Sequence, residues 1–402
     1  MKILVIGAGV GGLFFASFME GYSLKIIEKN EFAGRKLLAT GNGRCNFTNL
    51  NLSTDNYKSF SKDFVSYAIK NFTNQDLIRY FNEIGVLTTN LPSGRCYPLT
   101  MSAKTIRDSL FLKAKENASF IFNEEVKSFD LKKKQVKTTK KTYDYDYLVI
   151  ATGGISLRNS GSDGKIFKLL KNDIPLTDLS YAITNYETRE KLSKKAKGTK
   201  VSARASLYID GKFIKSSIDD IIFQDYGLTG TAILDISNDL TLGLMKNQTC
   251  QIRIDFFPDL SNEDFKFYIK NLISKFDSRS IKDILIGIIN EKLIDDILKI
   301  SKLKPHTLAI KISKSDLENL INNLKELTFN VSQIHDKENA QVTIGGFDSN
   351  FINPKTMESL KAKDVFIIGE SLDVAGDCGG YNIQWAASSA YICAKYLRSL
   401  DV

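Results

Sequence analysis

The feature that most constrains the fold is a glycine-rich turn between a buried strand and a helix, at the start of the chain. Residues 2–6 form a short apolar run, which is typical of a parallel strand covered on both faces. A GxGxxG sequence follows at once, and residues 13–20 then have helical spacing. A second apolar strand over residues 24–27 ends at Glu28. This order predicts a complete βαβ unit of a doubly wound α/β fold.

The glycines and the acid of this unit each have a physical role in binding a dinucleotide. Gly7 allows the tight turn, Gly9 lets the backbone approach a pyrophosphate, and Gly12 permits close contact between helix and strand. The N-terminus of the helix offers unpaired N–H groups to phosphate. Glu28 is placed to accept hydrogen bonds from the ribose hydroxyls, which favours an unphosphorylated ribose. The sequence therefore predicts FAD or NAD rather than NADP.

A polar stretch interrupted by glycines favours FAD. Residues 34–49 follow the second strand directly, where a simple dehydrogenase would continue into its next helix, and they carry cations suited to a diphosphate or a reduced flavin. Residues 151–154 end a buried strand in glycines. Residues 369–382 form another glycine loop, before a helix whose start can stabilise an anionic reduced ring. With the first turn these make four separated contacts, as an extended FAD requires.

Five strings in the sequence resemble a bacterial family of FAD-dependent oxidoreductases. Members of this family include aminoacetone oxidase, a bile-acid dehydro-reductase and ribosomal RNA dihydrouridine synthase. The resemblance spans nearly the whole chain, and the strings are long enough to be highly specific. They are GRKLLATGNGRCNFTN (34–49), ATGG (151–154), QVTIGGF (341–347), INPKTMES (352–359) and GESLDVAGDCGGYNIQWA (369–386).

The resemblance implies a fold of class α/β: a glutathione-reductase-type FAD-binding Rossmann-like fold with an inserted β-barrel-like domain and a small helical domain. The patterns agree, because residues 201–256 alternate as short strands and residues 261–325 have helical spacing. We predict an FAD-binding domain over residues 1–186 and 341–402, an inserted β domain over residues 187–258 and 328–340, and a helical subdomain over residues 259–327.

Periodicity also predicts individual elements. Residues 57–85 and 105–117 have helical spacing, and residues 119–150 alternate as a β-meander with Lys132 to Lys134 at a hairpin tip. The inserted helices are expected over residues 264–276, 281–299 and 314–327.

One loop departs from the family pattern. Residues 223–231 resemble the family's FTHxGxSGP loop, but Gln224, Asp225 and Thr231 replace its Thr, His and Pro. A role for that histidine is therefore not carried over to this chain. The chain's two histidines, His306 and His335, lie in the predicted insert and are interpreted as structural.

The expected cofactor contacts come from all the glycine-rich segments. They comprise turn glycines, the ribose-binding acid, the cations that follow it and carboxylates of the last loop that can hold ribityl hydroxyls. They are Gly7, Gly9, Gly11, Gly12, Glu28, Lys29, Arg35, Lys36, Gly41, Gly43, Arg44, Cys45, Asn46, Val126, Ala151, Thr152, Gly153, Gly369, Glu370, Asp373, Gly376, Asp377, Asn382 and Ile383.

A bound FAD supplies hydride chemistry, so the protein must position a substrate and deliver a proton. Cys378 and Tyr381, in the last glycine loop, and Cys45 are the candidate catalytic acids, and packing against the flavin is their alternative role. No second GxGxxG follows a strand, so NAD(P)H is expected as a transient reductant without a domain of its own. Electrons taken from the substrate itself are the alternative.

Composition limits the compartment and the partners. Five scattered cysteines without a CxxC pair predict a reduced, cytoplasmic protein without a metal site. No apolar run approaches the roughly 18 residues of a membrane span. Lys and Arg number 55 against 46 Asp and Glu, a net charge of +9, which permits a polyanionic partner. Basic runs at residues 127–141 and 189–200 are the candidate contacts to ribosomal RNA, with a solvated surface as the alternative.

Three functions remain open from the sequence. The first is reduction of a uracil in large-subunit ribosomal RNA to dihydrouridine, which requires the base to be flipped onto the flavin. The second is a small-molecule oxidoreductase, either an amine oxidase or an enone reductase, for which the positive charge is incidental. The third is a flavin-bound binding or sensor protein without catalysis.

Overall fold

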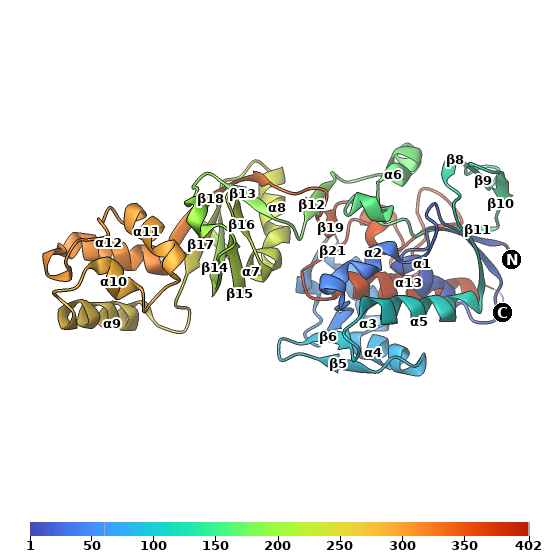
Figure 1. The fold of residues 1–402 in the computed structure, drawn as a ribbon. Coiled ribbons are helices and arrows are strands. Elements are labelled where there is room, and N and C mark those ends of the chain that lie inside the picture. Colours follow the sequence, from blue (N-terminus) through green and yellow to red (C-terminus); the bar gives the residue numbers. More distant parts are fainter. Residues whose placement is uncertain (60, 401–402) are drawn as a thin grey trace. The chain divides into compact units, whose positions relative to one another are not determined.

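The predicted βαβ unit forms the centre of a five-stranded parallel sheet in a computed structural model that describes residues 1–59 and 61–400 (Figure 1). Every pairing within this sheet is parallel, as the continuous apolar runs predict. One edge strand comes from the last part of the chain, so the sheet is completed by two distant segments. In spatial order the strands are β20 (Val365–Ile367), β11 (Tyr147–Ile150), β1 (Ile3–Ile6), β2 (Leu24–Ile27) and β7 (Ala118–Ile121).

Helix α1 (Val10–Phe18) packs against both α5 (Ala103–Lys115) and α13 (Tyr381–Ser399) (Figure 1). The predicted helix over residues 57–85 is wrong in its extent, because the chain forms two helices that are broken at Thr73, the N-cap of the second. The first unit's other helices are α2 (Arg35–Leu38), α3 (Lys62–Asn71), α4 (Asn74–Glu83) and α6 (Lys165–Leu170).

The predicted β-meander is shorter than residues 119–150. Its first and last segments are β7 and β11 of the parallel sheet, and only β8 (Val126–Asp130), β9 (Gln135–Thr138) and β10 (Thr142–Asp144) form an antiparallel sheet. The lysines at 132–134 lie at the tip between β8 and β9, as predicted. Three further small sheets complete the unit. One contains β3 (Thr48–Asn49), β6 (Arg95–Pro98) and β5 (Thr88–Asn90), in that order. The other two are the pairs β4 (Tyr57–Lys58) with β21 (Ala375–Gly376) and β12 (Ser180–Ala182) with β19 (Val342–Ile344).

The inserted β region is a closed barrel, which confirms the predicted barrel-like domain. Alternate residues of its strands point inward and are buried, as in Ala203, Ala205 and Leu207 of one strand. Two helices, α7 (Thr231–Asp235) and α8 (Ser237–Met245), interrupt the region that was predicted as strands alone. The barrel order is β13 (Tyr186–Thr188), β16 (Gly227–Thr229), β15 (Lys212–Phe223), β14 (Lys200–Ile209), β17 (Cys250–Asp255) and β18 (Leu327–Ile334).

The helical region contains four helices rather than the three predicted. The expected helix over residues 281–299 is divided, because Asn290 caps a new helix start. These helices share one apolar core with the barrel. They are α9 (Asn262–Lys275), α10 (Ile281–Leu285), α11 (Glu291–Ile300) and α12 (Lys314–Lys325).

The chain divides into two compact units. The first unit comprises Met1–Ala182 and the residues from Glu338 onward, and the second unit is Ile183–Lys337. The predicted junctions at residues 187 and 340 lie a few residues after these boundaries. The predicted β domain and helical subdomain both belong to the second unit. Residue 60 and the last two positions of the predicted ranges lie outside the described residues.

Candidate functional site

The turn after β1 can be built only with glycine at two of its positions. Gly7 has a φ of 101°, and a Cβ there would lie 2.6 Å from the carbonyl oxygen of Ala151. A Cβ on Gly12 would lie 2.1 Å from the carbonyl oxygen of Gly7. At Gly9, however, the nearest atom would be 3.7 Å away, so the protein itself does not require glycine there. The space beside Gly9 is compatible with the close approach of a pyrophosphate, which stays a prediction.

Helix α1 begins at this turn with its first N–H groups uncapped by side chains. Its N-cap is Gly9, which makes no side-chain hydrogen bond. The neighbouring N–H of Ala8 donates to Glu28 Oε2 at 2.8 Å, and Asn30 donates to Glu28 Oε1 from both its backbone N and its Nδ2. Glu28 is only 8% exposed and is therefore fixed in orientation beside the turn. A helix start next to an ordered carboxylate fits a pyrophosphate followed by a ribose.

Three less conspicuous predicted contacts lie near this acid. The backbone N–H of Glu124 donates to the Glu28 carbonyl at 3.1 Å, so Val126, at the start of β8, follows a segment joined directly to β2. Lys29 forms an ion pair with Asp163 at 2.9 Å. Arg35 donates to Asn30 Oδ1 at 3.2 Å and lies over the Phe32 ring. Val126, Lys29 and Arg35 therefore surround the Glu28 region, and their contact with a cofactor stays a prediction.

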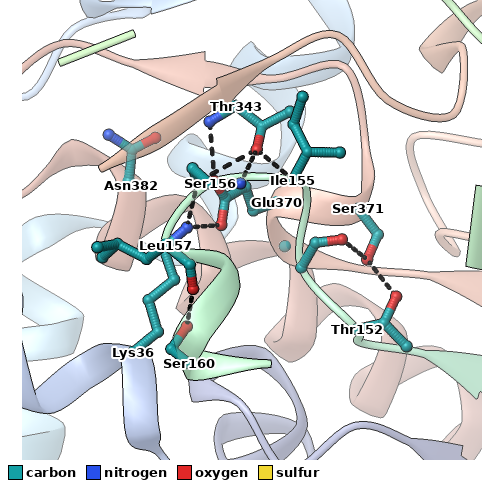
Figure 2. A network of polar contacts seen from close by, with 12 residues as sticks. Lys36, Thr152, Ile155, Ser156, Leu157, Ser160, Thr343, Glu370, Ser371 and Asn382 are labelled. Carbon is teal, nitrogen blue, oxygen red and sulfur yellow. Dashed lines mark hydrogen bonds and ion pairs between the residues drawn. The ribbon is translucent and has the colours of Figure 1, made fainter. Parts of the chain in front are cut away.

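Lys36 and Glu370, both predicted to contact the cofactor, contact each other in the network that Figure 2 shows. Lys36 Nζ lies 2.5 Å from Glu370 Oε2 and donates to Ser156 Oγ at 2.6 Å. Glu370 Oε1 accepts from Ser156 Oγ and from the backbone N–H of Thr343, both at 2.9 Å. The charge of Lys36 is thus compensated by protein. Sequence reasoning missed Ser156 and Thr343 as members of this network, although Thr343 lies in the QVTIGGF string.

The strand end at residues 151–154 is tied to the last glycine loop. Thr152 Oγ1 lies 3.3 Å from Ser371 Oγ, and Ser371 donates to the Gly153 carbonyl at 3.2 Å (Figure 2). Gly153 has a φ of 74°. Ala151 provides the carbonyl oxygen that faces Gly7. The glycine turn after β1 and the strand end at residues 151–154, which were predicted as separate cofactor contacts, are therefore adjacent.

The loop over residues 369–382 is held in shape by its own amide groups. Asn382 Oδ1 accepts from the Gly376 N–H, and Asn382 Nδ2 donates to the Gly376 carbonyl, both at 2.8 Å. The Gly369 carbonyl accepts from Trp385 Nε1 at 3.0 Å. A Cβ on Gly376 would lie 2.8 Å from Tyr381 Cβ, so the loop has no room for another residue type.

Two buried aspartates stabilise this loop, Asp373 through its carboxylate and Asp377 through its backbone N–H. Asp373 Oδ1 accepts from the Ser349 N–H at 3.0 Å, and the Asp377 N–H donates to the Asn56 carbonyl at 2.8 Å. Both side chains are almost fully buried, and so is Ile383 in the first turn of α13. The contact of the two aspartates with the ribityl chain stays a prediction.

The loop and the stretch over residues 34–49 meet at the start of α13. This helix has Gly380 as its N-cap, again without a side-chain cap. A Cβ on Gly380 would lie 2.6 Å from the Thr48 carbonyl oxygen, and Thr48 Oγ1 donates to Gln384 Oε1 at 2.6 Å. Two segments far apart in the sequence thus surround a second uncapped helix start. This is the arrangement expected at the flavin N1–C2=O edge.

Other predicted contacts in the 34–49 stretch have different environments. Gly41 and Gly43 have positive φ values of 55° and 79°. Arg44 is exposed, with its guanidinium 5.6 Å from the centre of the Tyr97 ring. Asn46 is buried and donates to the carbonyls of Thr48 and Cys96. Outside this stretch, the predicted contact Gly11 lies in α1 against the Ile368 side chain. Arg44 is accessible to a ligand, whereas Asn46 shapes the backbone.

The three candidate acids differ in accessibility. Cys45 is completely buried, and burial raises the pKa of its thiol to about 12. This location is the weakest of the three for delivering a proton to a substrate. Tyr381 is buried at the N-terminus of α13, and Cys378 is half-buried in the preceding loop. Cys378 and Tyr381 therefore remain the better candidates.

The histidines both lie in the second unit. His335 Nδ1 lies 3.0 Å from Glu187 Oε1, and its ring stacks on Tyr226 with 3.5 Å between ring centres. Tyr226 belongs to the loop that departs from the family pattern, and the neighbouring Asp225 forms an ion pair with Lys197 at 2.6 Å. The partners of His335 agree with the structural interpretation.

Neighbouring acids neutralise only part of each basic run. Three lysines in each run have a carboxylate oxygen between 2.5 and 3.6 Å away. Exposed pairs of this kind add little stability, but they reduce the charge available to a polyanion. The pairs are Lys127–Glu125, Lys133–Asp130 and Lys134–Asp364 in the first run, and Lys195–Asp295, Lys197–Asp225 and Lys200–Asp220 in the second.

The residues of the first unit fit FAD. A cradle that a Cβ would fill at Gly7 and Gly12 lies at one uncapped helix start, and the Gly380 turn lies at another. Glu28 is buried and oriented between β2 and the first turn. In the part of the chain that the structure describes, no cluster of three or more His, Cys, Asp or Glu side chains could hold a metal ion.

Comparison with known sequences identifies the family. A family described as the HI0933-like protein Rossmann domain matches residues 1–396. The chain belongs to this family. The HI0933-like fold and membership make it an FAD-dependent oxidoreductase, as the sequence predicts. Among residues 1–59 and 61–400, no helix is long and apolar enough to cross a membrane.

Three characterised relatives align with the HI0933-like chain over nearly their full length. The 3-dehydro-bile acid delta(4,6)-reductase of Clostridium scindens is 26% identical, over 98% of each chain. The ribosomal RNA dihydrouridine synthase of Haemophilus influenzae is 29% identical, over 97% of each chain. The enzyme of the same name from Escherichia coli is 28% identical, over 98% of this chain and 97% of its own.

Proposed function

We propose that this enzyme reduces an activated C=C bond, and that its substrate is a uracil of large-subunit ribosomal RNA, which becomes dihydrouridine. FAD, when bound, supplies the hydride, and NAD(P)H is the reductant that docks transiently. A uracil in structured RNA must be flipped out of its stack to reach the flavin. The hydride is added to one carbon of the C5=C6 bond, and a proton is added to the other.

The observation that carries this proposal is the uncapped start of α13, enclosed by the loop over residues 369–382 and by Thr48. N–H groups aimed from a helix start stabilise negative charge on a reduced ring. Tyr381, at this same start, and Cys378, in the preceding loop, carry protons that they could donate. Tyr381 is the preferred acid, because its backbone begins the helix and its position is fixed by packing against Gly376. We choose RNA as the substrate because two of the three relatives described above are ribosomal RNA dihydrouridine synthases.

Mass spectrometry of digested ribosomal RNA tests the substrate. RNA from cells lacking the gene should lose one dihydrouridine of the large subunit, and the wild-type gene should restore it. A Tyr381→Phe gene should restore it poorly, whereas Tyr208→Phe, a change on barrel strand β14, should restore it fully. Unchanged dihydrouridine in the deletion strain would refute the RNA substrate.

A small-molecule enone reductase is the second candidate, because the bile-acid reductase is also similar over 98% of the chain. Under anaerobic conditions, NADH or NADPH should bleach the flavin absorption band, and a steroid enone should restore it if this candidate is right. Absence of bleaching by either nucleotide would argue against NAD(P)H as reductant. Restoration by the enone, together with unchanged ribosomal RNA, would favour the small-molecule activity.

A further inference from the structure

The turn over residues 41–44 lies against the side chain of Tyr97. The guanidinium carbon of Arg44 is 5.6 Å from the centre of the Tyr97 ring, within the range of a cation–π contact. A Cβ on Gly41 would lie 3.7 Å from Tyr97 Cε1. Residues 42–44 are exposed. Tyr97 thus lies beside a surface that a ligand can approach.

Strand β6 connects Tyr97 with the start of α13. Its residue Cys96, next to Tyr97, pairs with Thr48 of β3. The carbonyl oxygen of Thr48 is the atom that a Cβ on Gly380 would meet at 2.6 Å. One strand therefore separates the strand that carries Tyr97 from the uncapped start of α13, where the flavin is expected.

The hydroxyl of Tyr97 is available to a ligand. Only 4% of the residue is exposed, and its hydroxyl makes no hydrogen bond with the residues 1–59 and 61–400 that the structure describes. The hydroxyl of Tyr145 also lacks a partner there, but it is completely enclosed by protein, whereas that of Tyr97 is not. An unpaired polar group at the edge of a buried region gains free energy when a ligand supplies its partner.

Nearby charges adjust the hydroxyl as a donor. Burial raises the pKa of Tyr97 above its usual value, and the positive charges of Arg95 and Arg44 act in the opposite direction. The thiols of Cys378 and Cys45, when ionised, raise this pKa, so both lie close to the hydroxyl. The hydroxyl therefore stays protonated at neutral pH, and the two cations favour negative charge on an oxygen that accepts from it.

We propose that the Tyr97 hydroxyl donates a hydrogen bond to the carbonyl oxygen of an α,β-unsaturated carbonyl substrate, with Arg44 beside it. The inference rests on the proposed reduction of an activated C=C bond. When hydride is added to the β-carbon, the electron pair of the C=C bond moves toward the carbonyl, and negative charge develops on its oxygen. A proton then reaches the α-carbon, and the carbonyl is restored. A donor aimed at this oxygen stabilises the developing charge.

This role differs from that of the acid. Tyr381 gives its proton to carbon, whereas Tyr97 keeps its proton and shares it with oxygen. A uracil contains the required unit, because its C5=C6 bond is conjugated with the C4 carbonyl, and a steroid enone contains it as well. The assignment therefore names the chemical group that the site recognises, whichever of the two substrates is right.

Stopped-flow reoxidation tests the assignment on the full-length, FAD-loaded protein. The protein is reduced with dithionite under anaerobic conditions and mixed with a uridine-rich single-stranded RNA or with a steroid 4-en-3-one. Tyr97→Phe should slow reoxidation about 100-fold, the usual loss when one donor to an oxyanion is removed. The matched control is Tyr145→Phe, because it removes an unpaired hydroxyl that is enclosed in the first unit. It should be reoxidised at the wild-type rate.

Further measurements distinguish this role from a structural one. In Tyr97→Phe the limiting rate at saturating substrate should fall, whereas the half-saturating concentration should change little, because the hydrogen bond strengthens as charge develops. The dissociation constant of FAD and the melting temperature should stay at the wild-type values, since the ring and its contact with Arg44 remain.

The outcomes separate this role from the proposed function. If a probe reoxidises Tyr97→Phe as fast as the wild type, Tyr97 is not the donor, while the reduction of an activated C=C bond still stands. If Tyr97→Phe binds FAD more weakly or melts at a lower temperature, Tyr97 supports the cofactor or the fold, and its contact with the substrate is overturned. If neither probe reoxidises the reduced wild type, the proposed function fails, and the role of Tyr97 fails with it.

Discussion

The helices around the predicted cofactor site begin differently from those of the helical region. α1 and α13 begin after Gly9 and Gly380, and neither has a side-chain cap. Each helix of the helical region has a polar side chain that accepts from an N–H in its first turn. These caps are Ser261 for α9, Ser280 for α10, Asn290 for α11 and Ser313 for α12.

A missing side-chain cap does not by itself mark a ligand site, because α5, α6 and α7 also begin without one. The first N–H groups of a helix need an acceptor, and Ser or Asn supplies one at little conformational cost. The first unit uses the same solution where no ligand is expected, since Ser61 and Thr73 cap α3 and α4. Glycine replaces the cap at the two starts beside the glycine loops. There the acceptor is expected to be the cofactor.

Gly12→Ala should have the largest effect. Its Cβ would meet the Gly7 carbonyl oxygen at 2.1 Å, so the turn must move, at a cost of about 3 kcal/mol. The purified protein should lose its FAD and melt at a lower temperature, as absorption spectra and thermal unfolding would record. Gly287→Ala is the control, because a Cβ there meets no atom within 4 Å. Full flavin content in Gly12→Ala would show that the α1 start is not the phosphate site.

Glu28→Gln should weaken FAD binding without unfolding the protein. The amide keeps the shape of the side chain but removes the charge that strengthens hydrogen bonds to ribose hydroxyls. Hydrogen bonds to charged groups contribute about 1.5–3 kcal/mol, so the dissociation constant should rise at least tenfold. Titration of the apoprotein with FAD measures this dissociation constant. The neighbouring exposed Glu31→Gln serves as control, and equal affinities of the two variants would remove Glu28 from the site.

Ser313→Ala should affect stability alone. Removing the N-cap of α12 should lower the free energy of unfolding by about 1 kcal/mol, which urea denaturation detects. Flavin content should stay at the wild-type level. Ser274→Ala, an exposed position in the last turn of α9, should leave stability nearly unchanged. Loss of FAD in Ser313→Ala would contradict the distinction between the two kinds of helix start.

Alkylation of the cysteines should give the smallest effect. Iodoacetamide should label the half-buried Cys378 first, because burial raises the pKa of Cys45 to about 12 and those of Cys96 and Cys250 to about 11. These three should stay thiols, and slow to react, between about pH 7 and 9. Peptide mapping follows each site. Added FAD should slow the labelling of Cys378. An unchanged rate would show that the loop that carries Cys378 does not contact the flavin.

The first turn could be predicted from sequence because its geometry is local. Gly7, Gly12 and Glu28 lie within one βαβ unit, where spacing alone determines what meets what. The strands of the inserted β region were also predictable from alternation, whereas the barrel was implied by the family resemblance. Helices α7 and α8 were not predictable, because residues 231–245 are apolar on most sides and lack the one-sided period of a surface helix.

Contacts between distant segments were beyond the sequence. Lys36 and Glu370 were each predicted to face the cofactor, but nothing in the sequence indicates that they pair across 334 positions. Similarly, Lys134 was counted as a free cation until its neighbour proved to be Asp364. Charge in a sequence is a sum, whereas charge on a surface depends on which acids the fold brings near.

The two-part construction of the first unit determines the order in which the protein can fold during synthesis. The second unit is complete once Lys337 has left the ribosome, whereas the parallel sheet still lacks β20 and α1 still lacks α13. The nascent chain must therefore keep the apolar surface of β11 from aggregating until the C-terminal segment arrives. A protein terminated before Val365 would contain every residue of the GxGxxG turn and still have no second helix start for the flavin.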